Sequence, residues 1–358
     1  MRRLACALAA LTLLTAACSP SEPVAATDPP KSTPSASAVE STPEPEPEPT
    51  AGATGEPSAA ATTPLTGMAA DDPALLARPV LAVKVDNAPL ARPQIGLQQA
   101  DVVVEELVEG GVTRLVALYQ STDPGTVGPV RSGREVDALL LPSFTPLVAM
   151  SGAHQTVKAD FSAADLPAVE EGQVSGWSRF AERPRPHNLF LNGPRLWEAA
   201  ADRPAPQPAW AFGDAPAGGE AVSAATLRFP RATSTWTWDA EAATWRRDQD
   251  GGPHIVLDET AGRAETQVTT DNVVLVRVTV RPGGRTDSSG TPTVDIAAVG
   301  EGDATVLRDG QAFTGRWRKP APDAPYEWLD ADGQPLPLKP GRTWIELLPT
   351  DSGLELTQ

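Results

Sequence analysis

The sequence predicts an α+β or α/β protein in which an N-terminal mixed α/β layered domain is followed by a mostly β C-terminal domain. Between residues 72 and 205, short apolar runs alternate with segments of helical pattern. Between residues 222 and 355, short runs of strand type are separated by Asp-Gly turns, as in all-β domains. The 358 residues leave room for two domains once an N-terminal leader and a polar segment are set aside.

Residues 1–17 have the pattern of a secretory signal peptide. Arg2 and Arg3 precede an apolar run over residues 4–14, which is too short to span a bilayer stably, and small residues follow it. We expect this segment to direct export and to be removed.

The stretch 13–17 (LLTAA) leads directly into Cys18 and resembles the lipobox of bacterial lipoproteins, with threonine where leucine is commoner. The resemblance implies that Cys18 becomes the first residue and that lipid is attached to its sulfur. We therefore expect an extracytoplasmic protein that is lipid-anchored to the cell membrane. The alternative is an ordinary signal peptide with an incidental cysteine.

Residues 18–70 are rich in proline, alanine, serine, threonine and glutamate and contain almost no large apolar residue. Such a segment cannot bury enough apolar surface to offset the entropy lost on ordering, so we expect a disordered tether. Proline-rich acidic chains are extended, at ~3.1 Å per residue, so this one would span on the order of 100 Å. That reach suits a tether through a cell wall.

Charge and cysteine content exclude several classes of function. The formal net charge of −17 at pH 7 disfavours general binding to nucleic acid or anionic lipid. The two cysteines are Cys6 and Cys18, so the exported part has no thiol left for a disulfide, a zinc–thiolate site or a nucleophile. No apolar stretch of the length of a membrane span follows Cys18.

In the first domain, strands and helices are expected to alternate. Buried strands are indicated over 79–86, 101–107, 112–120, 127–130 and 147–151. Helices are indicated over 94–100, 153–163 and 194–201. Ser132 and Glu135 match a capping box ahead of a further helix that reaches about Leu141.

Beyond a proline- and glycine-rich break over 203–220, the pattern is that of a β domain. Strands are expected over 234–238, 244–247, 273–281, 293–299, 315–319, 326–329 and 343–348. Six of the nine tryptophans lie in this half. Trp236 and Trp238 share one face of a strand, and they build either the core of a domain without disulfides or an exposed aromatic platform for a sugar or peptide.

No motif identifies a catalytic centre. The chain lacks Gly-x-Ser-x-Gly, a P-loop, His-Glu-x-x-His and a Gly-x-Gly-x-x-Gly pattern after a strand. The three histidines are far apart in the sequence, and no ligand spacing predicts a metal site. We predict no cofactor and no metal, and the sequence favours a protein without enzymatic activity.

A set of polar residues nevertheless gathers at strand ends and turns of the first domain, where ligands collect in α/β folds. The ligand-binding candidates are Asp86, Asn87, Arg92, Glu105, Glu109, Arg114, Arg131, Ser132, Arg134, Asp137 and His187. Arg131 and Arg134 beside a helix N-terminus would suit an anion, because free N–H groups and the helix dipole favour negative charge.

Several of these candidates also have a purely structural interpretation. Ser132 and Glu135 would then only cap a helix, and His187 would be a surface-loop histidine. The two arginines, Arg131 and Arg134, would only pair with carboxylates, the candidates being Glu105, Glu109 and Asp137.

Five segments of the first domain resemble one known family. They are 78–87 (RPVLAVKVDN), 91–97 (ARPQIGL), 99–105 (QADVVVE), 108–114 (VEGGVTR) and 128–132 (GPVRS). Together with 273–280 and 338–344 (LKPGRTW) of the second half, they are similar to the DUF3048 (YerB-like) lipoprotein family. The resemblance covers nearly everything after the tether and implies the family's fold and an envelope location, but no activity. The turn 151–154 (SGAH) departs from the glycine-richer turn expected there.

Two classes of function fit these observations. The first is a non-enzymatic lipoprotein that touches the membrane through its anchor and binds an envelope protein or an anionic envelope ligand. The second is a phosphotransferase or hydrolase acting on phosphate-linked envelope polymers. Segments 113–114 and 129–132 loosely resemble LytR-CpsA-Psr enzymes, in which arginines hold a pyrophosphate-lipid and an acid holds magnesium. A scaffold role would also fit.

Overall fold

The computed structural model describes residues 61–358, except residue 71 and residues 288–289. The predicted signal peptide, Cys18 and most of the predicted tether therefore lie outside the described residues. The last part of that tether is folded: Thr62 pairs with Ala69, and Leu65 is fully buried. The boundary predicted at residue 70 is too late, because Leu65 supplies an apolar anchor within a polar stretch.

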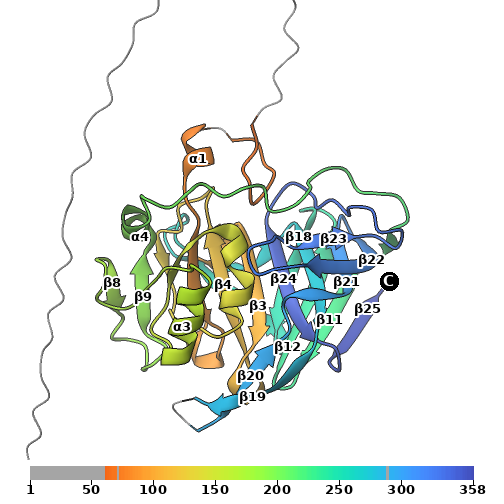
Figure 1. Ribbon diagram of the computed structural model, residues 1–358. Coiled ribbons are helices and arrows are strands. Elements are labelled where there is room, and N and C mark those ends of the chain that lie inside the picture. The colour runs from red at the N-terminus through yellow and green to blue at the C-terminus, as the bar shows by residue number, and fades with distance from the viewer. Residues whose placement is uncertain (1–60, 71, 288–289) are drawn as a thin grey trace, which may run out of the picture. The chain divides into compact units, whose positions relative to one another are not determined.

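The largest sheet is mixed and has eleven strands, in the order β10–β22–β21–β18–β24–β3–β4–β1–β6–β7, with β23 paired to β22 (Figure 1). The first half of the chain supplies β1 (Leu81–Asp86), β3 (Val102–Leu107), β4 (Thr113–Tyr119), β6 (Leu147–Ala149) and β7 (Ala168–Val169). The second half supplies β10 (Glu220–Ala221), β18 (Asn272–Val278), β21 (Gly300–Arg308), β22 (Gln311–Lys319), β23 (Glu327–Leu329) and β24 (Thr343–Pro349).

The two halves meet inside this sheet. Strand β24 runs parallel to β3, with Thr343 opposite Val102 and Glu346 opposite Glu105. Strands β1, β3, β4 and β24 are buried along their whole length, as their largely apolar sequences predict. Strands from both predicted domains therefore share one hydrogen-bonded sheet.

A second sheet of six strands packs against the large one. Its order is β14–β13–β12–β11–β25, with β17 paired to β13. The strands are β11 (Ala224–Phe229), β12 (Ala232–Asp239), β13 (Thr244–Gln249), β14 (Gly252–Pro253), β17 (Thr269–Thr270) and β25 (Gly353–Thr357). Trp236 on β12 packs edge-to-face on Trp344 of β24, with ring centroids 5.3 Å apart, and both rings are buried. Trp245, Trp317 and Trp328 are buried as well, which confirms the core interpretation of the tryptophans.

Three small sheets complete the strands. The first joins β2 (Gln94–Ile95), β15 (Ile255–Asp258) and β16 (Ala264–Gln267). The second joins β5 (Thr126–Val127), β9 (Leu189–Asn192) and β8 (Trp177–Arg179). The third is the hairpin of β19 (Val280–Thr286) and β20 (Pro292–Ile296). The hairpin belongs to the second half of the sequence, and its strand β20 contacts residues 109–111 of the first half (Figure 1).

Helices are few and short, so the protein is mostly β and the expected α/β layering of the first half is only loosely realised. The helices are α1 (Ala74–Ala77), α2 (Asp137–Leu140), α3 (Gln155–Ala163) and α4 (Gly193–Ala199), with 3₁₀ turns at Pro89–Ala91, Leu97–Gln99, Glu109–Gly111 and Pro142–Phe144. None of the helices in the described part of the chain is long and apolar enough to cross a membrane.

Three local predictions in the first half are wrong. The helix expected over 94–100 is strand β2 followed by a 3₁₀ turn, because Gln94 and Ile95 pair with β15 of the distant second half. The strand expected over 127–130 is reduced to β5, which ends at Val127. The capping box is absent: α2 begins only at Asp137, and the Ser132 hydroxyl bonds to that of Ser151 instead.

Candidate functional site

Strand β3 divides its polar residues between two faces of the large sheet. Successive side chains of a strand point to opposite faces, so the neighbours Glu105 and Glu106 lie on opposite sides. Glu106 is opposite Arg114 on β4, and Arg114 is opposite Asp86 on β1, so these three share one face. Glu105 lies on the other face, toward the six-stranded sheet.

The face that carries Arg114 opens into a cavity of about 720 Å³. It lies at the carboxyl ends of β1, β3 and β6, which run in the same direction. Its walls are Glu109, Val112 and Arg114, loop 131–135, turn 152–154 with the start of α3, and the β19–β20 hairpin. Four arginines line it, namely Arg114, Arg131, Arg134 and Arg285, and we call this cavity the arginine cleft.

Loop 131–134 is held in place between two strand ends. The Arg131 backbone N–H donates to the Lys84 carbonyl of β1 at 2.8 Å, and the Ser151 N–H after β6 donates to the Arg131 carbonyl at 2.9 Å. Gly133 permits this close seating, because a Cβ there would lie 2.8 Å from the Sδ of Met150. The arginines on the loop are therefore carried by a fixed backbone.

Arg114 is the most deeply placed of the four arginines, with 6% of its surface exposed. Its Nη1 donates to the Ser132 carbonyl at 3.1 Å, and no carboxylate of the described residues forms an ion pair with it. Burial, together with the charges of Arg134 and Arg131, lowers the pKa of Arg114 to about 10. The floor of the cleft therefore holds a cation, Arg114, that has no carboxylate in direct contact among the described residues.

The other arginines are held at the walls by carboxylates. Arg131 Nε lies 3.1 Å from Asp86 Oδ2, and Arg134 Nε lies 2.7 Å from Glu109. Arg285 of β19 reaches across to Glu135. Arg134 donates through both Nε and Nη2 to Glu109, as in the forks by which arginine recognises carboxylate and phosphate groups, and part of each guanidinium is still exposed.

The N-terminus of helix α3 adds positive potential to the cleft. Its N-cap, His154, accepts a hydrogen bond from the Thr156 N–H, and His154 with the preceding turn lines the cavity. Arg285 Nη1 lies 2.8 Å from His154 Nδ1. The helix dipole and the arginines therefore act in the same direction, toward an anion.

A buried ion triad lies beneath the cleft. Lys84 Nζ bonds to Glu106 and, at 2.7 Å, to Asp137 Oδ1, and all three side chains are buried. Asp137 Oδ2 accepts the Arg134 backbone N–H at 2.7 Å and so joins the triad to the cleft loop. Burial and the Asp137 charge raise the pKa of Glu106 to about 7, against the opposing effect of Lys84.

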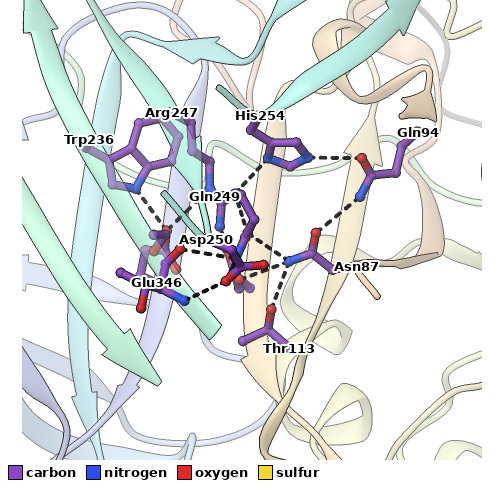
Figure 2. Close-up of polar contacts among 12 residues, drawn as sticks. Asn87, Gln94, Thr113, Trp236, Arg247, Gln249, Asp250, His254 and Glu346 are labelled. Carbon is purple, nitrogen blue, oxygen red and sulfur yellow. Dashed lines mark hydrogen bonds and ion pairs between the residues drawn. The ribbon is translucent and has the colours of Figure 1, made fainter. Parts of the chain in front are cut away.

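The opposite face of the sheet carries a buried polar network (Figure 2). Its members are Asn87, Gln94, Glu105, Thr113, Trp236, Arg247, Gln249, His254 and Glu346. Arg247 of β13 pairs with Glu105 and lies 4.9 Å from the ring centroid of Trp344. The network joins the two halves of the chain within the core.

The hydrogen bonds of the network fix the protonation of His254. Arginine can only donate, so His254 Nδ1 accepts from Arg247 at 2.6 Å, and its Nε2–H donates to Gln94 Oε1 at 2.9 Å. Burial and the Arg247 charge lower the pKa of His254 well below its usual range, in agreement with a neutral ring. Most polar atoms of the network bond to one another inside the protein, although Arg247 Nε and Glu346 Oε2 have no hydrogen-bond partner. The network is therefore a structural element of the core.

Two family models match the chain. "Protein of unknown function (DUF3048) N-terminal domain" matches residues 65–206, and the corresponding "C-terminal domain" matches residues 225–345. The chain belongs to the DUF3048 family. This DUF3048 protein is 29% identical over 302 residues to "Putative lipoprotein YerB" of Bacillus subtilis (strain 168), which covers 80% of this chain and 86% of that protein.

A solved relative shares the fold. The crystal structure of YerB from Bacillus subtilis matches with a TM-score of 0.70 at 26% identity, over 82% of this chain and 99% of that one. The family resemblance read from the sequence is therefore confirmed, and with it the fold that the resemblance implies.

In this DUF3048 protein the candidate residues predicted from the sequence divide into two groups. The arginine cleft or its margin brings together Asp86, Glu109, Arg114, Arg131, Ser132, Arg134 and His187, with Asp137 beneath it. Asn87 and Glu105 belong to the buried network, and Arg92 pairs with Asp250 at the network's rim. The predicted set therefore does not form one cleft.

The pairings of these residues also differ in part from the expected ones. Arg134 pairs with Glu109, as the structural interpretation predicted, but Arg131 pairs with Asp86, while Glu105 and Asp137 are taken by Arg247 and Lys84. His187 is not an isolated loop histidine, since its Nδ1 lies 2.7 Å from Asp86 Oδ2.

The candidates predicted from the sequence do not include Lys84, Glu106, His154 and Arg285, which lie in or near the cleft. A lysine within the apolar run of β1 was a usable signal, since a buried lysine requires a carboxylate partner. Arg285 had no local signal, because the hairpin that carries it is far away in the sequence.

Proposed function

We propose that this protein is a lipid-anchored envelope lipoprotein that binds an anionic ligand in the arginine cleft. The ligand would bear a phosphate or carboxylate group and would be held by Arg114 at the floor and by the arginines of the walls. The lipobox-like sequence before Cys18 and the similarity to a protein described as a lipoprotein support the anchor.

The state of Arg114 is the observation that carries the proposal. A buried guanidinium without a carboxylate in direct contact is costly, and two further arginines beside it increase that cost, against the opposing charges of Asp86 and Glu109. An anion in the cleft would remove the mutual repulsion and would supply the missing counter-charge. The N-terminus of α3 would contribute favourably to the same ligand.

Isothermal titration calorimetry with inorganic pyrophosphate and with citrate tests this proposal on the full chain. We expect binding of at least one probe, with Arg114→Gln weakening it by roughly 10- to 100-fold, as for loss of a charged hydrogen bond. Arg228→Gln is the matched control, because Arg228 is 60% exposed and its ion pair is with the exposed Glu355. Absence of binding to both probes, or equal affinity in Arg114→Gln, would contradict the proposal.

A further inference from the structure

We propose that Asp86, His187 and Arg131 form a hydrolytic centre at the margin of the arginine cleft, in which His187 is the general base toward a phosphate ester. This proposal rests on the proposed function, since the cleft arginines would hold the phosphoryl group.

One carboxylate oxygen holds both other members of this centre. Asp86 Oδ2 lies 2.7 Å from His187 Nδ1 and 3.1 Å from Arg131 Nε. The other oxygen, Oδ1, accepts the Ala88 N–H at 3.1 Å, so the carboxylate cannot rotate freely. Because they share one oxygen, the imidazole and the guanidinium are neighbours, and Arg131 lines the cleft.

The contact with Asp86 determines which nitrogen of His187 is basic. A carboxylate can only accept, so Nδ1 of a neutral ring carries the hydrogen and Nε2 keeps its lone pair. Among the described residues Nε2 has no hydrogen-bond partner, and it is not among the buried atoms that lack one, so it is open to solvent. An oriented imidazole with a free Nε2 is the arrangement that a general base requires.

Hydrogen bonds fix the loop that carries His187 to the segment that follows β1. The His187 backbone N–H donates to the Pro184 carbonyl at 2.9 Å. Arg183 donates to the carbonyls of Ala91 and Pro93 at 2.9 and 2.6 Å. The imidazole therefore keeps its position relative to β1, which ends at Asp86.

The reaction that this geometry supports is attack of water on the phosphorus of a bound ester. His187 Nε2 takes one proton of the water while its oxygen forms the new P–O bond. The bond to the leaving oxygen breaks, and the leaving group departs with the electron pair and takes a proton from solvent. The imidazolium returns its proton to solvent, and Arg131 neutralises charge on the phosphoryl oxygens.

Release of p-nitrophenol from p-nitrophenyl phosphate and from bis(p-nitrophenyl) phosphate tests the proposal on the full chain. We expect turnover of at least one ester, with His187→Ala lowering the rate by roughly 10²- to 10⁴-fold, as for loss of a general base. Added imidazole should restore part of the His187→Ala rate, which a merely structural histidine would not show. Asp86→Asn should also lower the rate, because an amide no longer enforces the Nδ1–H tautomer.

Arg228→Gln serves as the control and should retain the wild-type rate. No turnover of either ester by the wild-type chain would overturn the hydrolytic centre, as would a His187→Ala variant with an unchanged rate. Calorimetry with pyrophosphate on the same preparation separates the two proposals. Binding without turnover leaves the anion site standing, whereas absence of both removes both.

Discussion

Glu105 of β3 and Glu346 of β24 stand opposite each other on parallel neighbouring strands, and both are completely buried. Arg247 of the six-stranded sheet pairs with Glu105 and lies 3.9 Å from Glu346. One arginine cannot neutralise two buried carboxylates, so one of them must hold a proton. Burial and the Glu105 charge raise the pKa of Glu346 well above its usual value, while Trp236 donates to its Oε1 at 2.9 Å.

Glu346→Gln should therefore change how stability depends on pH. An unfolded glutamate loses its proton near pH 4.5, whereas folded Glu346 keeps it to higher pH. Between those values folding takes up a proton, so this group lowers the free energy of unfolding by ~1.4 kcal/mol per pH unit as pH rises. Glutamine removes that dependence, so the variant should gain stability relative to the wild type as the pH rises above about 4.5.

Urea unfolding at several pH values measures this effect. Glu355→Gln, on the exposed strand β25, is the control and should follow the wild type. Parallel curves for the wild type and Glu346→Gln would show that Glu346 is ionised in the folded protein.

A second prediction concerns the triad beneath the cleft. Lys84→Met leaves Glu106 and Asp137 buried without their cation, and we expect a loss of ~3–5 kcal/mol in unfolding free energy. The double variant Lys84→Met/Glu106→Gln removes one of the two charges and should recover part of that loss. Equal stability of the single and double variants, measured by urea unfolding, would argue against the electrostatic explanation.

The sequence predicted the strands of this protein better than its polar contacts. Continuous apolar runs mark β1 and β4 because both faces of the sheet are covered. The sequence also predicts that Arg131, Ser132 and Arg134 lie close together, because all three belong to one short loop after a strand. The parallel pairing of β3 with β24 had no local signal, because it joins residues more than two hundred positions apart.

The same reason explains the errors at the site. The sequence predicts Glu105 among the cleft residues, but the alternation of β3 places it on the opposite face from Glu106. Its partner Arg247 comes from β13, whose position depends on how the two sheets pack. A local pattern identifies which side chains are polar, but distant strands determine which of them meet.

A third prediction tests where the folded part begins. Leu65 is fully buried, so Leu65→Ala should cost about 2–5 kcal/mol in unfolding free energy. Deleting residues 19–60 should change it by no more than ~0.5 kcal/mol, as for changes away from the core. Thermal and urea unfolding of both variants measure this, and a large loss on deletion would show that the removed segment packs on the fold.

A fourth prediction concerns the lipid anchor. Cys18→Ala removes the sulfur that the lipobox-like sequence marks for modification, so the protein should be released into the medium or remain unprocessed. A single acyl chain binds a membrane only marginally, so stable anchoring requires several chains. Cell fractionation with immunoblotting measures the outcome. A variant that stays on the membrane at the mature size would contradict lipid anchoring.

The last prediction concerns the hairpin wall of the arginine cleft. Arg285 pairs with Glu135, and both side chains are partly exposed, at 28% and 21%. Such a pair contributes only ~0–1 kcal/mol, so Arg285→Ala should shift the melting temperature little. It should nevertheless weaken pyrophosphate binding by roughly 10-fold, because one cation of the cleft is lost. Arg316→Ala, on the exposed part of β22, is the control and should retain the wild-type affinity. Unchanged affinity in Arg285→Ala would confine the anion to the Arg114 side of the cleft, and a large drop in melting temperature would make Arg285 a structural residue.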